Sequence, residues 1–406
     1  MELKTSYLAH RVRTLKPSGI RKFFDATAGM SNIISLGVGE PDFVTPWNVR
    51  EAAILSLEDG RTSYTANSGL PALRTAIAGY MDNYFCVSYD PASEIIVTVG
   101  ASEAIDMAMR AILDPGDEVL VAEPCFVSYA PLVSLAGGEP VSIAAREENG
   151  FKVTAAQLEE ACTSRTKAIM ICSPNNPTGA MLSRPEMEAI AEVARRHDLL
   201  VISDEIYAEL VYDELYTSFA ALEGMRERTI LISGFSKDLA MTGWRVGFVC
   251  GPKELIAGML KIHQYAIMCA SAMAQYAALE GLRSGRDDIN EMRQSYRQRR
   301  NYIVESLNEM GLSCPQPEGA FYTFPSIVST GLDAETFATR LLQEEKVVVV
   351  PGDAFGACGA GHVRCSYATS MTQLQEAMTR MKRFVAGLRP NADIRAQRTR
   401  QSLSES

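Results

Sequence analysis

Short apolar runs alternate with longer stretches of helical periodicity over residues 48–282 of the chain. Seven of these runs are apolar almost throughout, a pattern typical of strands that are covered on both faces of a sheet. They lie at residues 95–99, 118–121, 140–143, 168–171, 199–202, 229–232 and 247–249. Because helical stretches separate them, the pattern predicts an α/β domain in which a mostly parallel seven-stranded sheet lies between helices.

The pattern changes near residue 283 and predicts a second, smaller α+β domain over residues 283–390. A long polar helix is expected at 287–310, and strands at 320–324, 347–350 and 362–366. The length of 406 residues exceeds the usual size of one hydrophobic core, which also favours two domains. Residues 1–47 are expected to form an arm that joins the smaller domain or lies across the site, and the polar residues 391–406 to form a mobile tail.

Composition excludes several classes of protein. Hydrophobic residues make up 47% and charged residues 22%, as in an ordinary globular protein, and the net charge is −10 with no block of Lys or Arg. Nucleic acids and anionic membranes are therefore not expected partners. The nine cysteines form no CxxC pair, which argues against a disulfide framework and against a metal site. No apolar run reaches the length of a membrane span and no signal peptide is apparent, so we expect a cytoplasmic protein.

The segment SGFSKDLAMTGWR places one lysine, Lys237, directly after the apolar run that ends at Ser233. A lysine that is desolvated, or lies beside a second cation, has a lowered pKa and can condense with an aldehyde. Arg245, eight positions later, is a candidate for that cation and for a phosphate ligand. From this segment alone, an ordinary loop lysine is an equally good interpretation.

Two further strand ends carry candidate binding residues. Ala101 and Ser102 follow Gly100 where a helix is expected to begin, and exposed amides at such a position can bind a phosphate. Phe126 follows the next strand, where its ring can stack on a heterocycle. The alternative interpretations are an ordinary strand-to-helix turn and a core phenylalanine.

Two more strand ends carry polar groups. Asn176 lies in the turn SPNNPTG, which is also a plain turn-forming sequence. Asp204 and Tyr207 follow the strand at 199–202. A buried aspartate can keep a pyridine nitrogen protonated and so make the ring an electron acceptor, and Tyr207 is a candidate donor to a phenolate oxygen. The alternative role for Asp204 is a helix N-cap.

These signals follow successive predicted strands of one sheet, and in that order they resemble the pyridoxal-phosphate enzymes of fold type I, in the class I and II aminotransferase family. The resemblance extends from Lys16 to about Leu388. It rests on the motifs GEPDF, SPNNPTG, SDEIY and MTGWRVG of a bacterial (gamma) subgroup, and on KPSGIRKF and KIHQYA, shared with Bacillus-type alanine and aromatic aminotransferases. It implies that residues 48–282 bind pyridoxal 5'-phosphate, and that the enzyme is a homodimer with shared active sites.

The resemblance also implies a role for each candidate residue. Lys237 is expected to form the Schiff base with the cofactor and to carry the substrate proton, with Asp204 at the pyridine nitrogen. Ring contacts are expected from Tyr207, Asn176 and Phe126. The phosphate is expected to bind Ala101, Ser102, Ser236 and Arg245, and also Tyr64 of a second subunit. Substrate is expected to contact Arg364 through its α-carboxylate, with Gly39, Asn176 and Ile20 nearby.

Some positions depart from relatives in this subgroup. Gly234 stands where some of them have a hydroxyl that binds the phosphate. Ser102 stands where the aspartate-specific ones have a lysine, and Ile20 where they have a hydroxyl. Loss of the lysine removes the partner of a second substrate carboxylate, although Arg21 beside Ile20 keeps this question open. We therefore expect an aminotransferase that uses L-alanine or aromatic amino acids and a 2-oxo acid such as 2-oxoglutarate in a ping-pong reaction.

Three alternatives stay open at this point. The first is an aspartate or N-acetyl-diaminopimelate-type aminotransferase. The second is a lyase or decarboxylase on the same scaffold, because the fold does not determine which substrate bond is broken. The third is a cofactor-binding regulator without activity, which the full set of expected polar residues, Lys237 included, disfavours.

Overall fold

The computed structural model describes residues 7–15 and 30–404. Ile20 and Arg21, which were expected near the substrate, lie outside the described residues, so their roles stay predictions. No helix in the described part of the chain is long and apolar enough to cross a membrane, and the cytoplasmic location also stays a prediction.

A seven-stranded sheet forms the centre of the larger domain, as the sequence predicted. The strands lie in the order β2 (Ile95–Thr98), β8 (Gly247–Cys250), β7 (Thr229–Gly234), β6 (Leu200–Asp204), β5 (Thr166–Cys172), β3 (Glu118–Glu123) and β4 (Glu139–Ala144). β8 pairs antiparallel with β2 and β7, and the other pairs are parallel. The carboxyl ends of the parallel strands therefore meet at one edge, where ligands bind in such sheets.

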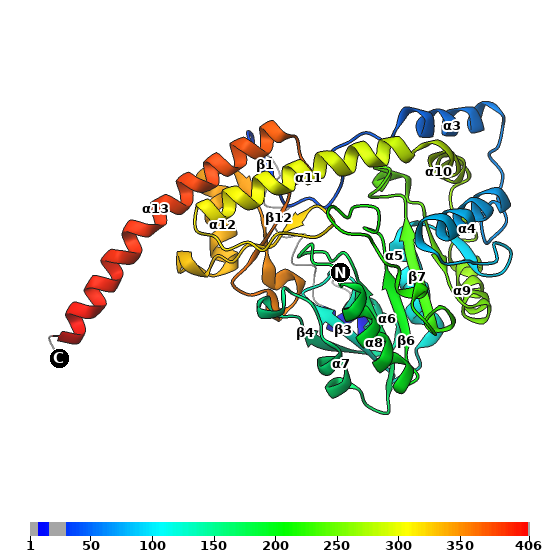
Figure 1. The fold of residues 1–406 in the computed structure, drawn as a ribbon, viewed down its shortest axis with the longest axis horizontal. Coiled ribbons are helices and arrows are strands. Elements are labelled where there is room, and N and C mark those ends of the chain that lie inside the picture. Colours follow the sequence, from blue (N-terminus) through cyan, green and yellow to red (C-terminus); the bar gives the residue numbers. More distant parts are fainter. Residues whose placement is uncertain (1–6, 16–29, 405–406) are drawn as a thin grey trace.

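Helices cover both faces of this sheet (Figure 1). Alternate strand residues point to opposite faces, so that Val119 and Val121 join one apolar cluster while Leu120 joins another. One face carries α5 (Gly100–Ile112), α6 (Tyr129–Ala136) and α9 (Lys253–Ala266). The other carries α3 (Trp47–Glu58), α4 (Pro71–Phe85), α7 (Ala155–Ala161), α8 (Arg184–Arg196) and α10 (Ala272–Ser284). Burial on both faces explains why the strands are apolar almost throughout.

The smaller domain lies beside the carboxyl edge of this sheet and packs around a core of its own (Figure 1). Its strands form a three-stranded sheet in the order β11 (Val350–Pro351), β12 (Val363–Ser366) and β9 (Tyr322–Thr323). Helices α11 (Arg286–Glu309), α12 (Ala334–Glu345) and α13 (Met371–Ser404) complete it. The long α11 begins next to α10 and ends in the smaller domain, so it connects the two parts.

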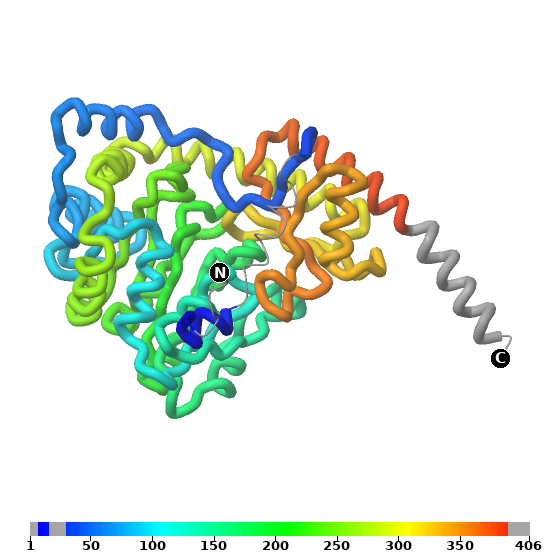
Figure 2. Tube along the Cα trace, turned by 180° about the vertical axis from the view of Figure 1, so that it is seen from behind, coloured from blue at the N-terminus to red at the C-terminus, as the bar shows by residue number. Residues whose placement is uncertain are grey.

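The N-terminal segment contacts both parts of the molecule. Strand β1 (Ile34–Ser35) pairs in parallel with β10 (Val347–Val348) of the smaller domain. Helix α1 (His10–Thr14) lies against the larger domain, where the side chain of Arg11 donates to the carbonyl of Leu135 at 3.1 Å. Figure 2 shows from behind that the backbone of α1 lies beside the larger domain and that of β1 beside the smaller domain. Among the described residues, β1 therefore packs on the smaller domain and α1 on the larger one, and the assignment of residues 1–47 to an arm stays a prediction.

Helix α13 differs from the sequence expectation, because the helical conformation continues to Ser404 through residues expected to form a tail. Whether residues 391–406 are mobile stays a prediction, as do the domain boundaries.

Candidate active site

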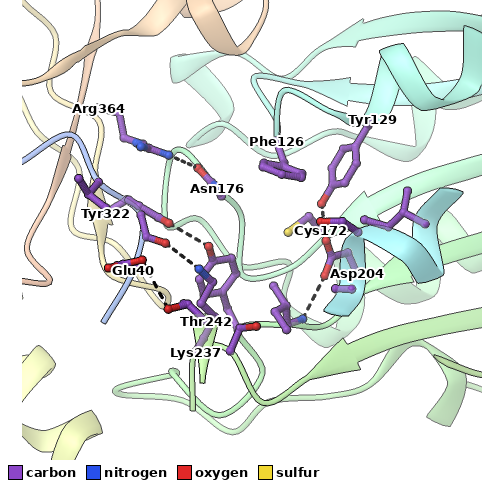
Figure 3. A pocket seen from close by; sticks show the side chains of 18 of the residues that line it. Glu40, Phe126, Tyr129, Cys172, Asn176, Asp204, Lys237, Thr242, Tyr322 and Arg364 are labelled. Atoms are coloured by element: carbon purple, nitrogen blue, oxygen red, sulfur yellow. Dashed lines mark hydrogen bonds between the residues drawn. The ribbon is translucent and has the colours of Figure 1, made fainter. Parts of the chain in front are cut away.

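A cavity of about 610 Å³ lies at the carboxyl edge of the large sheet, between it and the smaller domain. Its walls come from the ends of β5, β6 and β7, the first turn of α5, the loop after β1 and two strands of the smaller domain (Figure 3). The predicted residues among those that line it are Gly39, Ala101, Ser102, Phe126, Asn176, Asp204, Tyr207, Ser236, Lys237, Arg245 and Arg364.

Lys237 extends from the loop after β7 into the cavity. Its Nζ donates a 2.6 Å hydrogen bond to the carbonyl oxygen of Gly39, and lies 5.9 Å from the ring centre of Tyr207. Burial and, to a smaller extent, the positive charge of Arg364 lower the pKa of Lys237 to about 8. A substantial fraction of this lysine is therefore a neutral amine near pH 8, which is the form that attacks a carbonyl group.

Asp204 is the last residue of β6 and is almost fully buried. Its Oδ2 accepts a 2.7 Å hydrogen bond from the hydroxyl of Tyr129, and its Oδ1 accepts a 3.2 Å bond from the backbone amide of Ile206. Burial raises the pKa of Asp204, and these two hydrogen bonds oppose the rise. An added cation in the cavity would favour the ionised carboxylate, so Asp204 is suited to hold a protonated ring nitrogen.

Arg364 lies on β12 of the smaller domain and is 3% exposed. Its guanidinium donates to Asn176 Oδ1 at 2.8 Å and to the carbonyl oxygen of Gly37 at 2.6 Å. Its carbon lies 4.6 Å and 4.7 Å from the ring centres of Tyr322 and Phe355. The Nε of Arg364 is buried without a hydrogen-bond partner among the described residues. Arg364 lines the cavity, and its guanidinium is a buried positive group that can pair with an anion such as a carboxylate.

Tyr207 follows β6 and is fully enclosed. Its hydroxyl oxygen lies 2.9 Å from that of Tyr322, which comes from β9 of the smaller domain. Burial, together with the neighbouring Tyr322, raises the pKa of Tyr207 well above its ordinary value. The tyrosine therefore keeps its proton and is a hydrogen-bond donor.

The first turn of α5 forms the other end of the cavity. Gly100 begins the helix with a φ of +75°, and the amides that follow have no carbonyl one turn earlier to pair with. A Cβ on Gly100 would lie 2.8 Å from a guanidinium nitrogen of Arg245, so glycine allows this arginine to approach the helix end. Ser236 adds a hydroxyl to the same wall. Free amides, a hydroxyl and a cation together suit a phosphate.

One described residue among the predicted ones is not part of this cavity. Tyr64 is 81% exposed and does not line it, and Ile20 lies outside the described residues. Sequence reasoning also missed several residues that line the cavity, among them Gly37, Glu40, Tyr129 and Tyr322. Tyr129 follows Phe126 by three positions in the same strand-to-helix turn, so the turn gave a signal for it. Tyr322 had no comparable signal, because its partner is distant in sequence.

Comparisons with known proteins show the family of this chain. Residues 31–381 match the family described as aminotransferase class I and II. The chain is 63% identical to YugH of Bacillus subtilis (strain 168), over 94% of this chain and 99% of that protein. It is 48% identical to the aspartate aminotransferase of Pyrococcus abyssi, over 93% of this chain and 98% of that protein.

The chain also resembles the solved structure of the aromatic aminotransferase from Pyrococcus horikoshii OT3, with 45% sequence identity. The match covers 91% of this chain and 99% of that one, with a TM-score of 0.87. Family match, sequence identity and shared fold agree with one another. The chain therefore belongs to the class I and II aminotransferase family, whose members depend on pyridoxal phosphate.

Proposed function

We propose that this aminotransferase moves the amino group of an L-amino acid with a small apolar or aromatic side chain, with alanine the first choice, to a 2-oxo acid such as 2-oxoglutarate. The observation that supports the proposal is the meeting of Lys237, Asp204 and Arg364 in one cavity. These groups are a nucleophilic amine, a buried carboxylate and a buried guanidinium. They suit the cofactor aldehyde, the cofactor ring nitrogen and the substrate α-carboxylate, respectively.

The residues of the cavity fit pyridoxal phosphate. Asp204, Phe126 and Tyr207 all line the cavity. Asp204 would hold the ring nitrogen, Phe126 would stack on the ring, and Tyr207 would donate a hydrogen bond to the ring hydroxyl oxygen. The amides of Ala101 and Ser102, with Ser236 and Arg245, would hold the phosphate. When bound, this cofactor supplies an aldehyde that receives the amino group and a ring that accepts the electron pair released at the substrate α-carbon.

Three side chains of the cavity have separate roles in the proposed reaction. Lys237 Nζ, with a pKa lowered to about 8, is the base that removes the proton from the substrate α-carbon. Asp204 would keep the ring nitrogen of the bound cofactor protonated, since a negative charge in a buried site favours an adjacent cation. Arg364 pairs with the substrate α-carboxylate and is oriented for this by Asn176 and the Gly37 carbonyl.

The choice of donor follows from the charges around the cavity. Among the lining residues that the structure describes, the cations are Lys237, Arg245 and Arg364. Each already has a proposed partner, so none of these three is left for a second carboxylate, whether of aspartate or of the acceptor 2-oxoglutarate. Arg21, which lies outside the described residues, is the remaining candidate for that group. Ser102, which lines the cavity, is uncharged. These features support an apolar donor, whereas the names of similar proteins include both aspartate and aromatic aminotransferases.

We also propose a homodimer, in which Tyr64 reaches the phosphate of the neighbouring subunit. Its side chain is exposed and outside the cavity of its own chain, as a residue that acts on a second copy would be. Sedimentation of the active enzyme tests this, and a fully active monomer would contradict it.

The substrate proposal is tested by incubating the purified enzyme, loaded with pyridoxal phosphate, with single L-amino acids and 2-oxoglutarate. Formation of glutamate and the matching 2-oxo acid in equal amounts is expected, with alanine or an aromatic amino acid giving a higher kcat/KM than aspartate. Preference for aspartate would overturn the choice of donor. Release of ammonia or carbon dioxide would instead indicate a lyase or decarboxylase.

A further inference from the structure

Tyr322 joins the smaller domain to the catalytic wall of the larger one. It belongs to β9, is 1% exposed, and places its hydroxyl oxygen 2.9 Å from that of Tyr207, which is 3% exposed (Figure 3). Two buried hydroxyls at this distance share one hydrogen bond, and at any moment one donates and the other accepts.

The position of Tyr322 is fixed on three sides. Its ring packs against the ring of Phe321 at 4.8 Å and carries the guanidinium of Arg364 at 4.6 Å. On the third side a Cβ on Gly39 would lie 2.5 Å from the Tyr322 hydroxyl oxygen, so only glycine leaves this space. The hydroxyl is therefore held toward Tyr207 by packing.

We propose that Tyr322 is a positioning residue whose hydroxyl donates a hydrogen bond to the Tyr207 oxygen. The single hydroxyl hydrogen of Tyr207 is then directed to the ring hydroxyl oxygen of the cofactor. This inference rests on the proposed role of Tyr207. A tyrosine hydroxyl has one proton, so a Tyr207 that donates to the cofactor can only accept from Tyr322. A donor that itself accepts a hydrogen bond is polarised and donates more strongly.

The same contact links the two domains. Tyr207 follows a strand of the large sheet, whereas Tyr322 and Arg364 lie on neighbouring strands of the smaller domain, with Ser366 paired to Tyr322. The position of the smaller domain, which carries the carboxylate-binding arginine, therefore determines whether Tyr207 receives its hydrogen bond.

The experiment uses the full-length enzyme loaded with pyridoxal phosphate and follows the visible absorption of the bound cofactor against pH. The proton that titrates is shared between the ring oxygen of the cofactor and the Lys237 nitrogen that binds the cofactor. A weaker hydrogen bond from Tyr207 makes this ring oxygen more basic. The shared proton is then lost only at a higher pH. Tyr322→Phe is expected to raise the pH midpoint of the absorption change by about half a unit to one unit.

Two variants separate this role from general packing. Tyr207→Phe should raise the midpoint by more, and adding Tyr322→Phe to it should cause no further rise, because the intermediate hydroxyl is gone. Tyr367→Phe is the matched control, since its buried hydroxyl contacts Ala320 and Tyr212 and not Tyr207. It should leave the midpoint unchanged.

The possible results divide clearly. If Tyr207→Phe raises the midpoint and Tyr322→Phe does not, the inference about Tyr322 is wrong while the role of Tyr207 stands. The inference would also be overturned if Tyr322→Phe raised the pH midpoint equally with and without the Tyr207 hydroxyl. An equal rise of the midpoint in Tyr367→Phe would overturn it too. If Tyr207→Phe itself has no effect, the proposed role of Tyr207 is wrong and the inference falls with it.

Discussion

The hydroxyl of Tyr129 donates a 2.7 Å hydrogen bond to the carboxylate of Asp204, deep in the wall of the cavity. Asp204 is buried, and burial alone would favour its protonated form. Tyr129 is the first residue of α6. Its hydrogen bond is therefore one of the contacts that keep the Asp204 carboxylate ionised, so that it can pair with a protonated ring nitrogen.

Tyr129→Phe should raise the pKa of Asp204, because it removes the leading interaction that lowers this pKa. A hydrogen bond to a charged group contributes about 1.5–3 kcal/mol, so kcat should fall by about tenfold or more. The acidic limb of the kcat profile should move to higher pH, which steady-state rates across pH would show. Tyr89→Phe is the control, since its buried hydroxyl has no partner among the described residues. An unchanged acidic limb in Tyr129→Phe would contradict this role.

Arg364→Lys should raise KM about tenfold or more for every amino-acid donor. A lysine keeps the positive charge but lacks the forked donors that pair with a carboxylate, and it cannot reach Asn176 and Gly37 in the same way. KM measured for alanine, an aromatic amino acid and aspartate checks this. Arg340→Lys, a change at a half-exposed position of α12 remote from the cavity, should have no effect. A loss confined to one donor would show that Arg364 does not bind the carboxylate common to all of them.

Ser102→Lys should raise kcat/KM for aspartate relative to alanine by about tenfold, because it adds a cation at the cavity wall for the second carboxylate. The backbone amide proposed to bind phosphate is kept. Ser102→Met matches the length without the charge, and should not improve aspartate. Equal gains in both variants would mean that size rather than charge limits this substrate.

Asp238 follows Lys237 directly and is buried beside Glu209. Burial, followed by the charge of Glu209, raises the pKa of Asp238 to about 8. The folded state therefore holds this proton more tightly than the unfolded state, so its stabilising effect is complete at acidic pH and is lost as pH rises through about 8.

Asp238→Asn removes this titration. Its free energy of unfolding should exceed that of the parent enzyme by about 1–3 kcal/mol well above pH 8, and the difference should shrink near pH 5. Urea unfolding at the two pH values measures it. A difference that stays the same at both would show that the carboxyl does not titrate in this range.

The sequence predicted the large sheet well because its strands are buried on both faces, and an apolar run such as 229–232 has few other interpretations. Residues at strand ends, such as Asp204 and Lys237, followed from the rule that parallel strands end at one edge. Tyr322 could not be found this way, since its role depends on how the smaller domain docks. Gly37 was missed because it acts through its carbonyl, which leaves no mark on residue type.

The central claim is that Lys237 is the residue that binds the cofactor aldehyde, and chemical trapping tests it most directly. Borohydride reduction of the enzyme loaded with pyridoxal phosphate makes the bond between a lysine nitrogen and the cofactor carbon permanent, and mass spectrometry of peptides then locates it. We predict one modified residue, Lys237, and none in Lys237→Ala, which should also lack turnover. Modification of another lysine with Lys237 untouched, or a Lys237→Ala enzyme with normal turnover, would contradict the account.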